Sequence, residues 1–183
     1  ISGEEFVVWL QLKPIADIGI VGLPNAGKSS LLAAITNANP KVANYQFTTL
    51  NPNLGVANYD DKEVTVADIP GLVEGAHKGT GLGIQFLKHI ERCKSLLHMI
   101  DITSKDLKKD YKQIKNELKK YSSKLLKKKE LVVLNKTDLI DKNDINKIIK
   151  EFSKITSSEI ISLSTLKKNS ISQVKAKLIS YAS

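Results

Sequence analysis

The sequence predicts an α/β fold in which helices cover both faces of a mostly parallel sheet. The first reason is a short apolar run at residues 15–21, which passes through a glycine-containing loop into a helical pattern. The second is the alternation of apolar strands and amphipathic helices along the rest of the chain, which is typical of parallel sheets. The third is a single hairpin pattern, which adds one antiparallel strand.

The expected strands are short apolar runs of the kind that parallel sheets bury on both faces. They cover residues 15–21, 95–101, 131–134 and 160–163. Residues 53–59 and 63–68 flank Asp60-Asp61 and predict the hairpin. Helices are expected at residues 84–92 and where apolar residues recur at helical spacing, namely at Leu31, Leu32 and Ile35, at Leu107, Tyr111, Ile114, Leu118 and Tyr121, at Ile145, Ile148, Ile149 and Phe152, and at Ile171, Val174, Leu178 and Tyr181.

Length and cysteine content set the broad class. The chain has 183 residues, which suits one domain with a sizeable core. No run approaches the roughly 20 apolar residues that a bilayer span needs. The single cysteine, Cys93, excludes an internal disulfide and fits a reducing compartment. We therefore expect a cytoplasmic monomer without a membrane span.

The net charge of +9 is concentrated in the second half of the chain. Residues 101–183 hold twenty lysines and ten acidic residues. This half suits an anionic partner such as RNA. The alternative is that lysines simply decorate solvated helix faces, because Arg92 is the only arginine and phosphate recognition commonly recruits arginine.

Residues 22–29 read GLPNAGKS and match the phosphate-binding pattern GxxxxGK(S/T) between an expected strand and an expected helix. The glycines let successive backbone N–H groups point inward around phosphates, and the helix N-terminus adds partial positive charge. We expect Lys28 to reach the β- and γ-phosphates and the Ser29 hydroxyl to bind Mg²⁺. The predicted phosphate-binding residues are Gly22, Leu23, Pro24, Asn25, Ala26, Gly27, Lys28, Ser29 and Ser30.

Residues 135–138 read NKTD directly after an apolar strand and indicate a guanine-reading loop. The Asp138 carboxylate can accept hydrogen bonds from guanine N1–H and its exocyclic amine, donors that adenine lacks. Asn135 can meet the other edge of the base, and the Lys136 stem can lie along the ring. The predicted base-binding residues here are Asn135, Lys136, Asp138 and Leu139.

Two segments between the phosphate loop and the guanine-reading loop complete the predicted site. In Asp68-Ile69-Pro70-Gly71 the carboxylate can hold a magnesium-bound water, and the Gly71 N–H can meet the γ-phosphate. Thr48 and Thr49 lie in an aperiodic segment where a hydroxyl can join the magnesium shell, and Thr49 is the preferred ligand. The predicted metal ligands are Ser29, Thr49 and Asp68, and the further nucleotide contacts are Phe47, Thr48, Thr49, Leu50, Asn51, Asp68, Ile69, Pro70 and Gly71.

We expect the chain to hydrolyse GTP, and to do so slowly. Many GTPases place a water-orienting glutamine directly after DxxG, and this chain has Leu72 there. Asn25 is a candidate ligand for K⁺, because related GTPases use an asparagine at this loop position to hold that ion between the phosphates. The alternative is that Asn25 only favours a tight turn. The predicted catalytic residues are Asn25, Lys28, Thr49 and Gly71.

Four stretches resemble the Obg family of translation-associated GTPases. They are residues 12–19 (LKPIADIG), 45–55 (YQFTTLNPNLG), 68–83 (DIPGLVEGAHKGTGLG) and 85–92 (QFLKHIER). The similarity covers most of residues 12–138. It implies a Ras-like P-loop GTPase domain at residues 14–183, preceded at residues 1–13 by the tail of an N-terminal domain.

The same resemblance implies a role in assembly of the large ribosomal subunit, with that subunit or its rRNA as partner, GTP and GDP as substrate and product, and Mg²⁺ as cofactor. The base-capping segment of the family contains Ser-Ala, whereas this chain has Ser162-Leu163-Ser164. The backbone N–H of Leu163 is expected to meet the guanine oxygen. Three alternatives stay open: an ATP-using P-loop enzyme, which NKTD disfavours, a nucleotide-binding module with negligible hydrolysis, and a related GTPase of tRNA modification.

Overall fold

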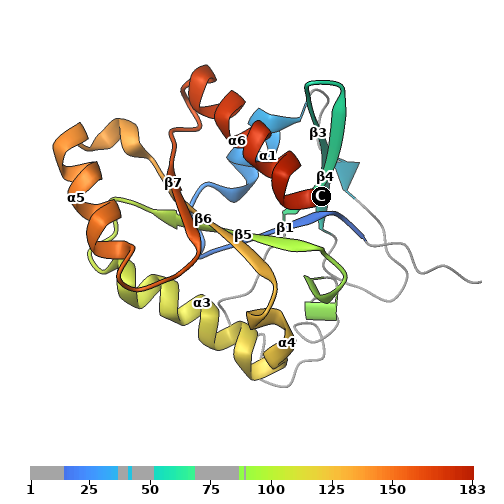
Figure 1. Ribbon diagram of the computed structural model, residues 1–183, viewed down its shortest axis with the longest axis horizontal. Helices are drawn as coiled ribbons and strands as arrows, with labels where there is room; N and C mark the ends of the chain where they lie inside the picture. The colour runs from blue at the N-terminus through green and yellow to red at the C-terminus, as the bar shows by residue number, and fades with distance from the viewer. Residues whose placement is uncertain (1–14, 37–40, 43–51, 69–86, 89) are drawn as a thin grey trace, which may run out of the picture.

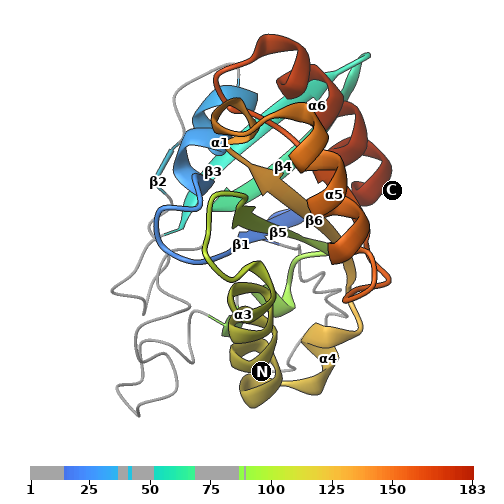
Figure 2. The same ribbon diagram turned by 90° about the vertical axis from the view of Figure 1, so that its left-hand side faces the viewer.

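The computed structural model describes residues 15–36, 41–42, 52–68, 87–88 and 90–183. Its centre is a seven-stranded sheet in the order β2-β3-β4-β1-β5-β6-β7 (Figures 1 and 2). The strands are β1 (Ile18–Val21), β2 (Lys41–Val42), β3 (Asn53–Tyr59), β4 (Lys62–Asp68), β5 (Ser95–Asp101), β6 (Lys129–Asn135) and β7 (Glu159–Ser162). The helices are α1 (Lys28–Ile35), α3 (Leu107–Tyr121), α4 (Ser123–Leu126), α5 (Lys142–Phe152), α6 (Lys168–Ala182) and the 3₁₀ helix η1 (Thr137–Leu139).

The strand directions confirm the predicted sheet. β1 pairs in parallel with both β4 and β5, and the parallel pairing continues through β6 to β7. β3 pairs antiparallel with β4 and β2, so β3 runs against the other described strands. The hairpin between β3 and β4 turns at Asp60 and Asp61, which both have left-handed backbone (φ 51° and 55°). Two left-handed residues match the hand of turn that tight hairpins require, and aspartate tolerates this conformation.

Helices cover both faces of the sheet, as predicted. α1 and α6 lie on one face, and α3 and α4 lie on the other (Figures 1 and 2). α5 joins the α3 side, because its Phe152 packs with Tyr111 of α3 over Val132 and Leu134 of β6. The predicted apolar faces of α3 and α6 are confirmed, since their buried residues are Tyr111, Ile114 and Leu118 and Val174, Leu178 and Tyr181.

Some local boundaries differ from the prediction. The run at residues 15–21 forms a strand only at Ile18–Val21. The four-residue helix α4 has too few residues to show a helical period, and it begins because the Ser122 hydroxyl caps it by accepting from the Lys124 N–H. Within the described ranges, every helix is too short or too polar to span a bilayer.

A buried polar cluster ties α3 to the sheet. The Glu130 carboxylate of β6 accepts hydrogen bonds from Ser158 Oγ (2.8 Å), Lys115 Nζ (3.2 Å) and Tyr111 Oη (3.0 Å). His98 Nδ1 lies 3.2 Å from the same carboxylate, and burial lowers the pKa of His98. Neutral His98 therefore donates its Nδ1–H. Burial alone would raise the pKa of Glu130, but the hydrogen bond from His98 and the other partners outweigh it and hold that pKa below its ordinary value.

We predict that Glu130→Gln lowers the free energy of unfolding at pH 7 by about 2–4 kcal/mol, because buried partners lose a charged acceptor. The folded carboxyl has the lower pKa, so its stabilising effect is present above pH 4.5, the ordinary value, and is lost progressively as the pH falls below it. Urea unfolding at pH 7 and at about pH 3 should therefore show a smaller difference between the two proteins at the lower pH.

The matched control is Glu151→Gln, at an exposed position of α5. It should change the free energy of unfolding by no more than about 0.5 kcal/mol. A loss at Glu130 that is the same at both pH values would contradict the ionised state assigned to this carboxylate.

Candidate nucleotide-binding site

The predicted site residues gather at one edge of the sheet, where the parallel strands end. Asp68 is the last residue of β4, Asp101 of β5 and Asn135 of β6. The loop of residues 22–27 leaves the end of β1, the strand between β4 and β5. The chain leaves β1 toward one side of the sheet and later crosses to the other, so this edge holds the topological switch point where open α/β sheets bind ligands.

Two glycines of the loop are required by close contacts. A Cβ atom at Gly22 would lie 2.3 Å from the backbone oxygen of Met99 on β5. A Cβ atom at Gly27 would lie 2.3 Å from Asn135 Nδ2, and Gly27 also has left-handed backbone (φ 98°). Glycine therefore lets the loop lie directly against β5 and against the side chain of Asn135.

Lys28 stands at the first turn of α1 with its ammonium folded back over the loop. Its Nζ donates to the carbonyl oxygens of Gly22 and Leu23, both at 3.0 Å. Burial lowers the pKa of Lys28, and the charge of Asp68 partly offsets that shift. An ammonium carries three donors, so two fix its position and one remains for an anion.

Ser29 and Asp68 form a pair of oxygen groups beside Lys28. Ser29 Oγ donates to Asp68 Oδ2 at 2.7 Å. Asp68 is buried, and its Oδ1 has no hydrogen-bond partner in the described part of the chain. A hydroxyl and an under-used buried carboxylate oxygen are hard ligands of the kind that Mg²⁺ prefers, so these two residues fit the predicted metal site.

Asn135 joins the loop of residues 22–27 to the end of β6. Its Nδ2 donates to the Ala26 carbonyl oxygen at 2.9 Å, and the side chain is buried. The amide nitrogen has a second hydrogen, which this bond leaves unused. The phosphate-binding and base-reading motifs, 109 residues apart in sequence, are therefore in direct contact.

Lys136 adopts left-handed backbone (φ 68°), and its Nζ lies 2.5 Å from Asp101 Oδ2. Asp101 also accepts from the backbone N–H and hydroxyl of Thr103. Burial would raise the pKa of Asp101, but the hydrogen bonds from Lys136 and Thr103 hold it below its ordinary value. Asp101 thus orients Lys136. No motif in the sequence predicts this role, although residue 101 ends the strand that is paired with the Asn135 strand.

The Asp138 side chain is held by Ser164 of the predicted base-capping segment at residues 162–164. Ser164 Oγ donates to Asp138 Oδ1 at 2.5 Å, and this bond lowers the pKa of Asp138. Thr137 N–H donates to the Leu163 carbonyl oxygen at 3.2 Å. The Leu163 N–H donates to the Leu134 carbonyl at 2.9 Å, so it continues the pairing of β7 with β6 past Ser162. This differs from the expectation that the Leu163 N–H would meet the guanine oxygen.

Several predicted residues lie outside the described part of the chain and stay predictions. They are Phe47, Thr48, Thr49, Leu50, Asn51, Ile69, Pro70, Gly71 and Leu72, together with residues 1–13. Among those described, Ser30 and Leu139 are exposed, whereas Ser164 is buried. Within the described residues, the structure brings together the phosphate loop, the Ser29–Asp68 pair and the base-reading residues, whereas the segments around Thr49 and Gly71 lie outside the described part of the chain.

The fold and the site define a P-loop nucleotide-binding domain of Ras-like architecture. Solved structures agree with that architecture. The apo cytosolic domain of the FeoB iron transporter from T. maritima matches with a TM-score of 0.67 and 19% identity, covering 90% of this chain and 63% of that chain. The G domain of the same transporter matches with a TM-score of 0.64 and 20% identity, covering 91% of this chain and 98% of that one. At such identities the likeness shows the fold alone.

Sequence comparison gives the family. A family model described as "50S ribosome-binding GTPase" matches residues 17–136. A GTPase Obg of Pelagibacter ubique is 71% identical over 181 residues, covering 99% of this chain and 55% of the relative. A GTPase Obg of Rickettsia felis is 52% identical over 162 residues, covering 88% and 49%. The chain belongs to the 50S ribosome-binding GTPase family, and its resemblance to Obg is confirmed. It spans about half the length of these two relatives.

We predict that Gly27→Ala lowers the free energy of unfolding by about 1–3 kcal/mol, because the new methyl group strains the backbone and displaces the Asn135 amide from Ala26. In an Asn135→Ala background the same change should cost only the backbone strain, about 1 kcal/mol. A double-mutant cycle with urea unfolding measures the difference. Additive effects of the two substitutions would show that the close contact does not constrain the loop.

Proposed function

We propose that this chain binds GTP with Mg²⁺, hydrolyses it slowly and acts as a conformational switch in assembly of the large ribosomal subunit in the cytoplasm. The observation that carries the proposal is the hydrogen bond from Asn135 Nδ2 to the Ala26 carbonyl. It sets the phosphate loop beside the loop of Asp138, so one nucleotide can reach both. The names of the family and of its Obg relatives support guanine as the base.

The phosphate end rests on the loop of residues 22–27 and on Lys28. The N–H groups of this loop and the α1 N-terminus suit phosphate oxygens. The Lys28 ammonium is fixed by two carbonyl groups and directs its remaining donor to the β- and γ-phosphates. Ser29 and Asp68 would hold Mg²⁺ at the same end, where the ion would neutralise phosphate charge.

The base end rests on Asp138 and Asn135. Ser164 fixes one Asp138 oxygen, so the carboxylate faces guanine N1–H and the exocyclic amine in a set orientation. The unused hydrogen of the Asn135 amide meets the other edge of the base. Asp101 holds the Lys136 ammonium, which leaves the lysine stem to lie along the ring. Because the Leu163 N–H is engaged in the sheet, the guanine oxygen must be met by another donor of the segment that follows.

Hydrolysis is slow because Leu72 cannot orient the attacking water. Lys28, Thr49 and Gly71 act on the phosphates, and Asn25 recruits K⁺. Leu72 also favours a second candidate, a module that binds nucleotide without useful hydrolysis. Single-turnover hydrolysis of bound GTP separates the two: no product over hours at saturating Mg²⁺ and K⁺ selects the second.

We predict that substitutions at the two ends of the site change nucleotide affinity in different ways. Lys28→Ala should weaken GDP and GTP alike by about 10–100-fold, since one charged hydrogen bond is lost. Asp138→Asn should weaken GTP by about 100-fold or more and improve xanthine nucleotides, because an amide donates where guanine also donates. Calorimetric titration with GTP, GDP, ATP and XTP measures both.

Matched controls are Lys150→Ala and Asp144→Asn on α5, which are exposed and are not among the predicted site residues. Both should bind like the unmodified chain. ATP binding as tightly as GTP would refute the guanine assignment.

We predict that turnover is about tenfold or more faster in K⁺ than in Na⁺ at equal ionic strength, because the ion stabilises charge that develops between the phosphates. Asn25 has left-handed backbone (φ 66°), which glycine adopts without strain. Asn25→Gly should therefore remove the potassium effect and keep the loop conformation. If the unmodified chain turns GTP over at equal rates in K⁺ and Na⁺, Asn25 does not bind K⁺ and only favours the turn of the loop.

A further inference from the structure

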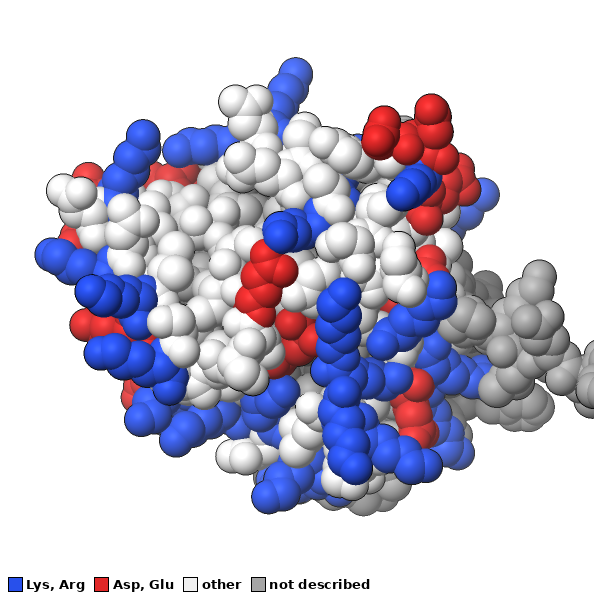
Figure 3. All heavy atoms as spheres, in the orientation of Figure 1, with Lys and Arg blue, Asp and Glu red and all other residues white. Residues whose placement is uncertain are grey.

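Positive charge is concentrated on the helices that follow β5. Residues 105–129 contain eleven lysines and three acidic residues, Asp106, Asp110 and Glu117, giving a net charge of +8, whereas the whole chain has +9. Lysines accordingly crowd the lower part of the face shown in Figure 3, where Figure 1 places α3 and α4. We name the α3–α4 lysine face by six exposed residues, Lys108, Lys109, Lys112, Lys119, Lys124 and Lys127.

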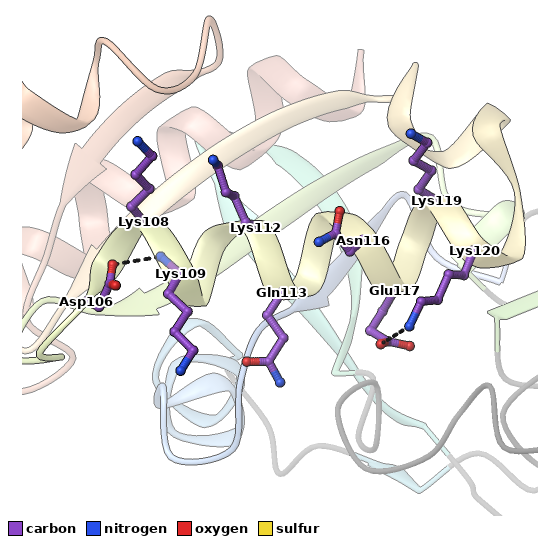
Figure 4. Close-up of a pocket in the computed structure, with 9 residues that line it drawn as sticks. All are labelled: Asp106, Lys108, Lys109, Lys112, Gln113, Asn116, Glu117, Lys119 and Lys120. Atoms are coloured by element: carbon purple, nitrogen blue, oxygen red, sulfur yellow. Dashed lines mark hydrogen bonds and ion pairs between the residues drawn. The ribbon is translucent and has the colours of Figure 1, made fainter.

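Among the described residues, these six ammonium groups have no hydrogen-bond or ion-pair partner. None makes an ion pair with a described residue, whereas Lys115 pairs with Glu130 and Lys120 with Glu117. Lys108, Lys112 and Lys119 point to one side of α3, and Lys109 points to the other (Figure 4). The row from Lys108 to Lys119 extends for about 16 Å along the helix axis.

The lysine row opposes helix formation. Lys108 and Lys112 stand four residues apart, where like charges destabilise a helix. α3 forms because Asp106 caps it by accepting from the Lys109 N–H and because Tyr111, Ile114 and Leu118 are buried. A neutral or mixed surface would serve that packing equally well, so the row indicates an anionic partner.

The apolar face of α3 decides between two kinds of anionic partner, a membrane surface and a nucleic acid. A helix that binds a membrane surface needs a free apolar side, and the apolar side of α3 is buried against the sheet. A nucleic-acid duplex needs no such side, since its phosphates present a dense line of charge to exposed lysines. Gln113 and Asn116 stand among the lysines along a shallow hollow of about 690 Å³ and carry amides that can bond 2′-hydroxyl groups (Figure 4).

We propose that the α3–α4 lysine face binds the phosphate backbone of duplex RNA. The choice of RNA over DNA rests on the proposed ribosomal function. Among the described residues, the hollow is lined by α3 and its cap and by none of those predicted to bind the nucleotide, so substitutions of these lysines leave the described nucleotide-site contacts in place.

The test compares two triple variants with equal loss of charge, using the 183-residue chain and a labelled RNA duplex of roughly 20 base pairs. Lys108→Gln, Lys112→Gln and Lys119→Gln together should weaken binding about tenfold or more at ~50 mM salt and reduce the salt slope by about 2–3. The control, Lys142→Gln, Lys150→Gln and Lys154→Gln, removes exposed charge around α5 and should change affinity less than about threefold. Fluorescence anisotropy measures both.

Equal losses in the two triples, or no loss in the first, would overturn the proposal. So would equal affinity for a DNA duplex of the same sequence, or binding to phosphatidylglycerol vesicles in place of RNA. GDP affinity is measured on all three proteins and should be unchanged by either triple. If the unmodified chain fails to bind GDP or GTP, the proposed function fails whatever the RNA result, so the two failures are distinguishable.

Discussion

The contact between Asn135 and the phosphate loop is the constraint on which the rest of the site depends. The amide donates to the Ala26 carbonyl and at the same time occupies the space where a side chain at residue 27 would stand. Gly22 is held as tightly, with the Met99 oxygen beside it. The loop is thus fixed against the backbone of β5 and against the Asn135 side chain of β6. Its distance from the base-reading residues follows from the register of those two strands.

The sequence predicts those features of the fold that depend on local spacing. The apolar faces of α3 and α6, the hairpin at Asp60-Asp61 and the two loop motifs all follow from patterns within a few residues, and the fold class is confirmed. The contacts that the sequence did not predict are long-range. The pair of Lys136 with Asp101 and the bond of the Leu163 N–H depend on which strand lies beside which, and no spacing along the chain encodes that.

The two loops of the site reach left-handed backbone with different residues, Asn25 and Gly27 in the phosphate loop and Lys136 in the base-reading loop. All ten glycines lie at or before Gly83, so the phosphate loop has residues that tolerate close contact and left-handed backbone. The base-reading loop has none, and Lys136 takes a left-handed conformation that costs a non-glycine residue about 1 kcal/mol or more. The ion pair with Asp101 and the bond from Thr137 to Leu163 hold that turn in place.

In the proposed functions lysine serves two kinds of anion, and burial separates them. The Lys28 ammonium is partly buried and fixed by two carbonyl groups, so it suits a small phosphate cluster bound in a single geometry with little screening by salt. The lysines of the α3–α4 face are exposed and unpaired within the described chain, so they suit a polymer whose charges recur along a line and whose binding weakens steeply with salt. A domain with both can couple a discrete chemical signal to docking on a large charged surface, because the same strand, β5, ends beside the nucleotide site and leads into α3.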